Sequence, residues 1–164
     1  MALTLQRSSQ TLSPRPPTAH HKSDQPSRDL HLASDAAYIR SILKTIAGPI
    51  VLVGHSYGGA VITNATIGVP NVKALVYIAG FAPDTGETLA QLVTMNPGSE
   101  IMQNVIPRKF PLPGGGEGTD LYLTEHGFET AFVSDLPKSV ADRMWAEQRP
   151  FSQEAFTSKS GAPA

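Results

Sequence analysis

The stretch 50–65 constrains the fold of this chain more than any other part of the sequence. It begins with branched aliphatic residues, Ile50 to Val53, which lie between Pro49 and Gly54. A short apolar run bounded by turn residues is typical of a buried strand in a parallel sheet. The small and aliphatic residues from Ala60 onward predict a helix. The sequence therefore predicts a strand that passes through a tight turn into a helix.

The turn has the pattern G-x-S-x-G, formed by Gly54, Ser56 and Gly58 and followed by Gly59. A serine at a sharp strand-to-helix turn is held in a strained backbone conformation, where side chains two residues before and after it would collide. Such a turn raises the Ser56 hydroxyl above the sheet and directs the Tyr57 N–H at a developing oxyanion. The pattern predicts Ser56 as a nucleophile, the Tyr57 N–H as an oxyanion donor, and the glycines as the residues that permit the turn.

Two other interpretations of this turn fit less well. A phosphate-binding loop requires G-x-x-x-x-G-K-[ST] or G-x-G-x-x-G, and the turn contains neither pattern. A glycine-rich turn with an incidental serine is the structural alternative. The motif becomes specific when it lies between a buried strand and a helix, as its mechanics require.

Together with two later segments, the turn resembles the α/β-hydrolase superfamily, in particular esterase-like members related to plant methyl esterases and hydroxynitrile lyases. The segments are residues 54–62 (GHSYGGAVI), 72–79 (VKALVYIA) and 81–87 (FAPDTGE), and the resemblance covers roughly Leu32 to Phe156. It implies an α/β fold, a partial α/β-hydrolase fold with parallel strands, flanking helices, a helical lid and an incomplete sheet. It also implies a serine hydrolase acting on a small ester or acyl compound, and a lyase on the same scaffold remains open.

The segment after the turn predicts a second buried strand over Val72 to Ala79, parallel to the first through a right-handed crossover. The next loop leaves the carboxyl end of this strand, where ligands bind in open α/β sheets. We therefore expect Phe81 to line a pocket beside Ser56. Asp84 is either a triad acid or a turn residue that starts a helix over Thr85 to Val93. We favour the turn, because the similar esterases place their triad acid later.

A serine hydroxyl needs a base to accept its proton and an acid to orient that base. The resemblance implies an acid and then a histidine on strands after the lid, and this chain ends shortly after the lid. The first strands, with the loop that supplies a second oxyanion amide, are missing too. We therefore expect a chain truncated at both ends, with weak or no activity alone. The alternative is a non-catalytic remnant that binds small hydrophobic ligands or a protein partner.

Two histidines are candidates for the missing base. His126 lies near the start of a predicted lid helix, from which it would have to swing toward the site. His55 adjoins Ser56, but neighbouring side chains in extended backbone point apart. We interpret His55 as a packing and hydrogen-bonding residue under the turn.

The chain divides into four predicted parts. Residues 1–32 are rich in Ser, Pro and basic residues, which predicts disorder. Residues 33–96 form the α/β core, with a first helix capped by Ser34. Residues 97–156 form a lid-like region: a loop over Asn96 to Thr119, a short strand, and two helices. Residues 157–164 are small and polar and are expected to form a frayed tail.

The composition of the chain limits the kinds of substrate, cofactor and binding partner that we expect. A net charge of −1 gives no reason to expect a nucleic acid or a membrane surface. The lack of cysteine leaves no thiolate chemistry or disulfide framework. We expect an ester-like small-molecule substrate, no cofactor and no metal, and the lack of a secretory signal favours a cytoplasmic location. Unpaired sheet edges invite association, so we expect a marginal chain that self-associates.

Overall fold

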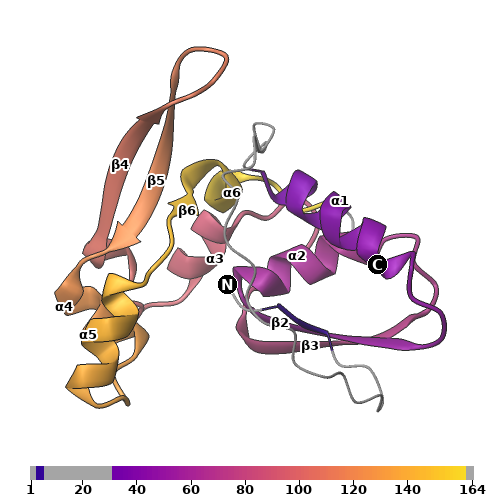
Figure 1. The fold of residues 1–164 in the computed structure, drawn as a ribbon, viewed down its shortest axis with the longest axis horizontal. Coiled ribbons are helices and arrows are strands. Elements are labelled where there is room, and N and C mark those ends of the chain that lie inside the picture. The colour runs from indigo at the N-terminus through magenta and orange to yellow at the C-terminus, as the bar shows by residue number, and fades with distance from the viewer. Residues whose placement is uncertain (1–2, 6–30, 162–164) are drawn as a thin grey trace, which may run out of the picture.

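The core of the protein is a sheet with two helices on one of its faces (Figure 1). The computed structural model describes residues 3–5 and 31–161. Within these residues the first sheet has the order β1-β2-β3, with β2 and β3 parallel and β1 antiparallel to β2. Its elements are β1 (Leu3–Leu5), α1 (Leu32–Leu43), β2 (Ile50–Ser56), α2 (Tyr57–Ala65) and β3 (Val72–Gly80). The predicted strand, turn, helix and parallel strand are confirmed.

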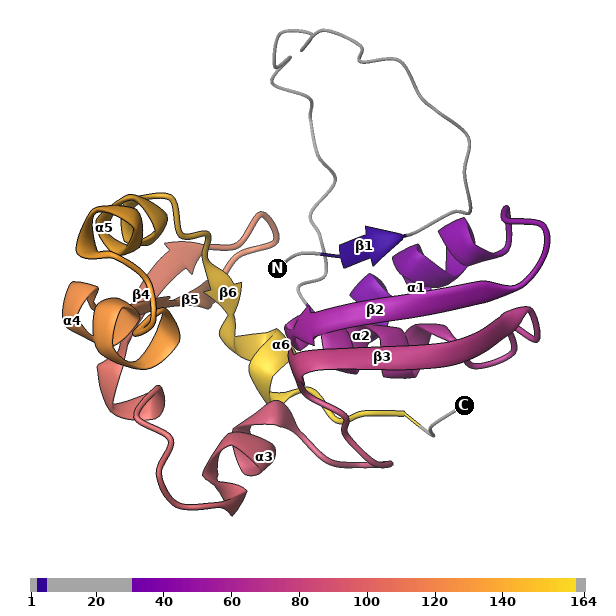
Figure 2. The same ribbon diagram turned by 90° about the horizontal axis from the view of Figure 1, so that it is seen from below.

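A second lobe follows α3 in the chain and holds a second sheet, of order β4-β5-β6. Figures 1 and 2 place its hairpin, β4 and β5, with α4 and α5 beside the first sheet, to which β6 and α6 connect them. Its elements and the preceding ones are α3 (Leu89–Met95), η1 (Met102–Asn104), β4 (Val105–Pro111), β5 (Glu117–Leu123), α4 (Glu125–Gly127), η2 (Phe128–Phe132), α5 (Lys138–Ala146), β6 (Phe151–Ser152) and α6 (Gln153–Thr157). None of the described helices is long and apolar enough to span a membrane.

One face of the first sheet is buried under α1 and α2. Leu52 of β2, Leu43 of α1 and Ile62 of α2 are all fully buried in one cluster. The helix α1 begins at Leu32, which is also buried, so Ser34 lies in its first turn and is not the N-cap. The start of this helix is therefore set by an apolar residue that must reach the core rather than by the best capping residue.

The guanidinium of Arg40 fixes α1 to the end of α2. Its Nε donates to the carbonyl oxygen of Ala65 at 3.1 Å, and its Nη2 donates to that of Asn64 at 2.5 Å. Carbonyls in the last turn of a helix have no partner within the helix, and a cation there also meets the negative end of the helix dipole. This contact holds the helix layer together at the end remote from Ser56.

No helix or strand of the described residues covers the opposite face of the sheet. Val51 is 48% exposed, Val76 is 41% exposed and Ile78 is 55% exposed. Figure 2 views this face directly, and α1 and α2 both lie behind it. The predictions that the first strand is fully buried and that the second is buried are therefore both wrong, because Val51 belongs to β2, and Val76 and Ile78 belong to β3. The apolar residues of both strands were assigned to a sheet covered on both faces, whereas the described helices cover only one.

The N-terminal segment departs from its predicted disorder at Leu3–Leu5. These residues form β1, paired with Leu52 to Gly54 of β2. The rest of that prediction lies outside the described residues. The short strand supplies β2 with a neighbour on the side away from β3.

The predicted loop over residues 96–119 is largely a β-hairpin. Strand β4 pairs with β5 along its whole length, from Val105 with Leu123 to Pro111 with Glu117. The two prolines in β4 are more typical of a loop than of a strand, because proline has no N–H to donate to a neighbouring strand. However, β4 lies at the edge of its sheet, where proline is tolerated. The glycines at the tip, Gly115 and Gly116, have φ of 89° and 88°, which glycine adopts without strain.

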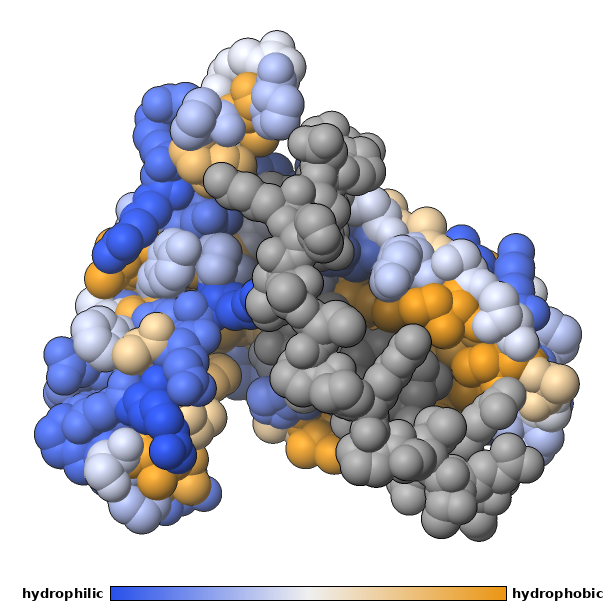
Figure 3. Space-filling view, in the orientation of Figure 1, coloured by the Kyte–Doolittle hydropathy of each residue, from blue (hydrophilic) through white to orange (hydrophobic). Residues whose placement is uncertain are grey.

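The two helical patterns of the lid-like region form α4 with η2, and α5. Phe128 is buried there with Met144 and Trp145 packed against its cluster, so these side chains pack against each other. Phe132 is different, because it is 45% exposed and only stacks on Phe128 at a ring distance of 4.9 Å. Figure 3 shows that the surface of this lobe is mainly hydrophilic, whereas hydrophobic atoms gather over the sheet and its helices.

The tail is held as far as Gly161, in contrast to the predicted fraying from Thr157. Ser160 is 4% exposed, and the Gly161 N–H donates to Asn64 Oδ1 at 2.7 Å. Ser160 also exchanges backbone hydrogen bonds with Gly86 and Glu87. Small polar residues indicate a loose end, but a buried amide on α2 gives this tail specific partners.

Candidate active site

The end of β2 and the start of α2 form a strained bend at Ser56. Ser56 has φ 53° and ψ −127°, and the helix begins at Tyr57. A positive φ is uncommon for residues other than glycine, and this combination costs on the order of 1–3 kcal/mol. Strain of this kind persists only where contacts with the surrounding structure hold the backbone in place.

The neighbouring glycines allow backbone segments to approach closely at the bend. A Cβ on Gly54 would lie 2.6 Å from the carbonyl oxygen of Gly58, and one on Gly59 would strike the carbonyl oxygen of Phe81. Distances this short do not occur for real Cβ atoms, and backbone cannot rotate aside. The motif does not require a glycine at position 59. The close contact between α2 and the loop after β3 does require one there.

The bend is tied to the loop at the end of β3. The Phe81 N–H donates to the Ser56 carbonyl oxygen at 3.1 Å, and Ser56 is paired with Gly80. The structure therefore places Phe81 directly beside Ser56, partly buried against the cluster that contains Tyr57. Ser56 itself is partly exposed, and its hydroxyl makes no hydrogen bond within the described part of the chain.

The buried side chain of Tyr57 holds the first turn of α2 against α1 and β6. Its side chain is 6% exposed, its hydroxyl donates to Asp35 Oδ2 at 2.8 Å, and its ring meets that of Phe151 edge-on at 4.9 Å. Burial, and then the hydrogen bond and the negative charge of Asp35, raise the pKa of Tyr57 far above its ordinary value. No local pattern in the sequence indicates this role for Asp35, because its partner lies 22 positions away in the chain.

Asp84, the candidate acid, is occupied in a turn. Its Oδ1 accepts from the Thr85 N–H at 2.7 Å, and its own N–H donates to Glu87 Oε2 at 2.7 Å. The helix predicted to follow at Thr85 starts only at Leu89, with Thr88 as its N-cap. Asp84 is also exposed, which agrees with the favoured turn interpretation.

Neither candidate histidine forms a hydrogen bond with the Ser56 hydroxyl. His126 is exposed on α4, which both ribbon views place in the second lobe, away from the β2–α2 junction (Figures 1 and 2). His55 pairs with Ile78 in the sheet and is partly exposed. Among the residues that the structure describes, no hydrogen bond joins Ser56 to a histidine or a carboxylate.

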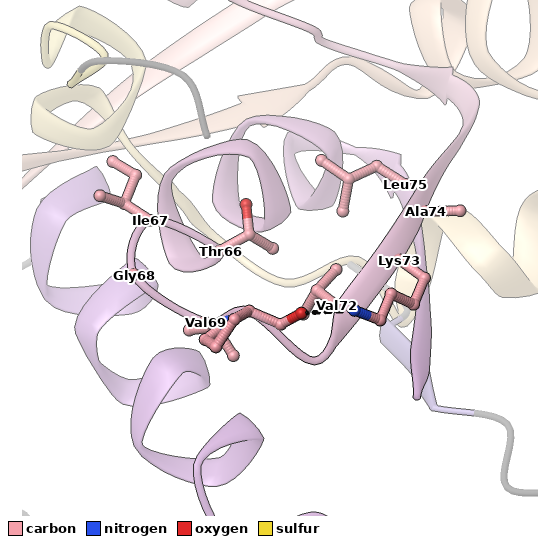
Figure 4. A pocket seen from close by; sticks show the side chains of 9 residues that line it. Thr66, Ile67, Gly68, Val69, Val72, Lys73, Ala74 and Leu75 are labelled. Carbon is pink, nitrogen blue, oxygen red and sulfur yellow. Dashed lines mark hydrogen bonds between the residues drawn. The ribbon is translucent and has the colours of Figure 1, made fainter. Parts of the chain in front are cut away.

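Two other features of the molecule lie elsewhere. A shallow hollow of about 570 Å³ borders the loop between α2 and the start of β3 (Figure 4), at the opposite end of β3 from Ser56. Glu125, Glu129 and Asp142 form an acidic cluster, and the ammonium of Lys138 pairs with Glu129 and with Asp142. Neither feature belongs to the bend.

The strain at Ser56 predicts an unusual response to substitution. Ser56→Gly should be more stable than Ser56→Ala by about 1 kcal/mol. Glycine adopts this backbone conformation without strain, which favours Ser56→Gly, but it loses more conformational entropy on folding, which reduces the difference. Both variants lack the hydroxyl, so the comparison isolates the backbone. Urea unfolding followed by circular dichroism measures the difference, and equal midpoints would show that the bend is unstrained.

Comparison with known proteins places this bend in a family. The chain matches the alpha/beta hydrolase family over residues 4–163. It is 39% identical over 127 residues to a carbendazim hydrolyzing esterase from Nocardioides sp. (strain SG-4G), covering 73% of this chain and 49% of that protein. The chain therefore spans about half the length of this curated relative.

Solved structures agree with the fold. Polyneuridine aldehyde esterase superposes with a TM-score of 0.63 at 16% identity, covering 80% of this chain and 55% of that one. An extracellular alpha/beta-hydrolase from a Paenibacillus species superposes with a TM-score of 0.63 at 21% identity, covering 89% of this chain and 57% of that one. A methylesterase from Arabidopsis superposes with a TM-score of 0.55 at 17% identity, covering 87% of this chain and 55% of that one. The strand, the bend and the helix, together with the match over residues 4–163, show that the chain belongs to the alpha/beta hydrolase family.

Proposed function

We propose that this protein is a serine hydrolase of the esterase type, in which Ser56 attacks a small ester or acyl compound. The observation that carries the proposal is the strained, partly exposed Ser56 at the junction of β2 and α2. Strained backbone conformations cluster at functional sites, and the packing of the core does not call for one at Ser56. The 39% identity to an esterase supports the same class of reaction.

The reaction follows from the groups at the bend. The Ser56 Oγ adds to the substrate carbonyl carbon, and the carbonyl oxygen becomes an oxyanion. The serine proton passes to solvent water, which returns a proton to the alkoxide as it leaves. The Tyr57 N–H, at the free start of α2, donates to that oxyanion. Collapse expels the alcohol and leaves an acyl group on Ser56, which water then removes. Phe81 would form an apolar wall beside the acyl group.

The second lobe would act as the lid over this site. Its link to the bend is the contact between Phe151 of β6 and the ring of Tyr57, continued by Phe156 of α6. A lid excludes water from the reacting groups and shapes the acyl or alcohol pocket. The single observation for this role is that the lobe is joined to the core at the residue next to Ser56.

A second candidate function is binding without catalysis. It is favoured by one observation: in the described residues, Ser56 has no histidine or carboxylate hydrogen-bonded to it to accept its proton. Without a base, a serine hydroxyl is a poor nucleophile at neutral pH. The protein would then bind small hydrophobic ligands, or a protein, at the same bend.

A fluorophosphonate probe separates these functions. With the full chain, we expect phosphonylation of Ser56, located by peptide mass spectrometry, about 100-fold faster than that of the exposed Ser99, because one oxyanion donor contributes about 10²–10³ in rate. Ser56→Ala should abolish this labelling, whereas Ser99→Ala should leave it unchanged. Folded protein whose Ser56 reacts no faster than Ser99 would favour binding alone.

Turnover is a separate measurement. Hydrolysis of p-nitrophenyl acetate should fall to the uncatalysed rate in Ser56→Ala. A protein that is labelled at Ser56 but does not turn over the ester has the nucleophile and lacks an effective base. That result would retain Ser56 as the reactive group and would reject independent catalysis by this chain.

A further inference from the structure

Strand β3 contains one residue more than its neighbour β2 at the level of Ser56. His55 pairs with Ile78 and Ser56 pairs with Gly80, so Ala79 lies between two paired residues and forms a β-bulge. Figure 2 shows β2 and β3 ending side by side at this point. Bulges re-aim the side chains that follow them and are over-represented next to active sites.

Ala79 is also strained. Its φ is 40°, and within residues 3–5 and 31–161 only Ala79 and Ser56 have a positive φ without being glycine. A bulge position with a positive φ usually holds glycine, because a Cβ makes this backbone conformation costly. Strained residues cluster at functional sites, and here Ala79 directly precedes the residue that pairs with Ser56.

The side chains of β3 that precede the bulge alternate between the two faces of the sheet. Tyr77 faces α2, because its hydroxyl oxygen lies 2.8 Å from that of Thr63 in a hydrogen bond. Ile78 therefore faces away from α2, and it is 55% exposed. By the same alternation, the first residue after Ile78 would face α2 and the second would again face away.

The extra residue reverses this order for Phe81. Without Ala79, Phe81 would be the second residue after Ile78 and would lie on the same face. With Ala79 it is the third residue, and its side chain packs against the buried cluster on the helix side that contains Tyr57. The bulge thus accounts for the face on which Phe81 lies.

The pairing at Ser56 does not itself require the bulge. Gly80 pairs with Ser56, and the Phe81 N–H donates to the Ser56 carbonyl oxygen at 3.1 Å. If Ala79 were deleted, Gly80 would still follow the last regular pair and take the same place. A glycine is needed there, because a Cβ on it would lie 3.0 Å from the Gly54 carbonyl oxygen. The extra residue therefore sets the direction of the Phe81 side chain and not the pairing.

We propose that Ala79 is a positioning residue of the reaction, because its bulge turns Phe81 to the helix side of the sheet, beside the Ser56 nucleophile. This inference rests on the proposed function of Ser56. Phe81 would contact the acyl group, so Ala79 would influence the choice of acyl group by acting through Phe81. An apolar wall favours a longer alkyl chain, since each methylene removed from water contributes about fourfold in rate.

Urea unfolding of the full chain tests the placement of Phe81 without any reaction. Phe81→Ala should raise the unfolding equilibrium constant at least tenfold in the native chain, because it removes a ring that packs in the core. In a chain that lacks Ala79, where the ring faces away, the same substitution should raise it less than about threefold. Ala79→Gly keeps the extra residue and adopts a positive φ freely, so it should retain the tenfold effect.

Ala79→Val provides a second test in a chain of native length. A β-branched residue is a genuine outlier at a positive φ, so valine disfavours the bulge and should also reduce the effect of Phe81→Ala to less than about threefold. Circular dichroism checks that each variant is folded. If the deletion does not fold, Ala79→Val decides the outcome.

The same variants are then compared in the reaction. Relative to their hydrolysis in buffer, an octyl fluorophosphonate should phosphonylate Ser56 about tenfold faster than a methyl one in the native chain and in Ala79→Gly. The ratio should fall below about threefold in Phe81→Ala, in the deletion and in Ala79→Val. Combined with Phe81→Ala, the changes at Ala79 should not alter the ratio further, since they act through the same ring. A merely structural residue would slow both probes alike.

The outcomes separate this inference from the proposed function. Equal effects of Phe81→Ala on unfolding with and without the bulge would overturn the placement of the ring, however Ser56 reacts. If Ser56 reacts no faster than Ser99 in the native chain, the proposed function is rejected, and the role of Ala79 in a reaction is rejected with it. Fast labelling of Ser56 with a probe ratio that is insensitive to Ala79 would retain the proposed function and overturn the inference.

Discussion

Replacement of Gly54 by alanine is expected to destabilise the protein by about 3 kcal/mol or more, near the upper end of overpacking effects. The added Cβ would lie 2.6 Å from the carbonyl oxygen of Gly58 and 2.8 Å from the amide nitrogen of Gly59. These atoms belong to the first turn of α2, so no side chain can rotate aside to relieve the collision. The helix would have to move away from β2. Urea unfolding measures the loss as a lower midpoint.

The matched control is Gly114→Ala. Gly114 lies at the exposed tip of the hairpin, with nothing within 4 Å of an added Cβ, so its substitution should change stability by less than about 0.5 kcal/mol. The displaced helix would also carry the Tyr57 N–H away from Ser56, so Gly54→Ala should slow phosphonylation while Gly114→Ala should not. Equal midpoints for the two variants would show that the bend has room for a side chain.

The sequence was most informative where the determinants are local. The strand, the bend and the start of α2 are specified within residues 50–65 by apolar length, by glycines at fixed offsets and by a helix start. The parallel orientation of β3 is expected because a helix between two strands returns the chain to the end of the sheet at which the first strand began. Each of these rules acts on a few neighbouring residues, and the strand, the bend, the helix and the parallel pairing are confirmed.

Predictions failed where the outcome depends on what packs from elsewhere. The apolar residues of β3 are compatible with one or two covered faces, and only the arrangement of the helices decides which. The prolines of β4 indicated a loop, but the same residues are tolerated once β4 is at an edge. The tail is ordered by Asn64, more than ninety positions away in the chain. Local pattern contains no information about such partners.

Tyr57 is the residue on which the site and the second lobe both depend, and Tyr57→Ala is expected to cost about 3–5 kcal/mol, as for other large buried aromatic side chains. The substitution removes the ring that Phe151 contacts at 4.9 Å and the donor to Asp35. It opens a cavity between α1, α2 and β6 immediately under the bend. Phosphonylation of Ser56 should slow along with the loss of stability, because the first turn of α2 loses its support.

Tyr57→Phe separates the ring from the hydroxyl. It keeps the contact with Phe151 and should cost only about 1–2 kcal/mol, the range for a lost hydrogen bond to a charged partner that water can partly replace. Asp35 is partly exposed, so its carboxylate can be rehydrated. Urea midpoints that fall equally in Tyr57→Phe and Tyr57→Ala would show that the hydroxyl bond to Asp35, and not the ring contact with Phe151, accounts for the contribution of this side chain to stability.

The phenol should also make stability depend on alkaline pH. The folded chain holds the pKa of Tyr57 above its ordinary 10.0, first through burial and then through Asp35, so the unfolded chain releases this proton first as the pH rises. Its contribution is complete below pH 10 and is lost above it, by about 1.4 kcal/mol per pH unit. Tyr57→Phe lacks this proton and keeps the other tyrosines, so its free energy of unfolding should fall less steeply between pH 10 and 11. Equal slopes would mean that the Tyr57 hydroxyl already ionises in the folded protein, and the buried bond to Asp35 would then have to be abandoned.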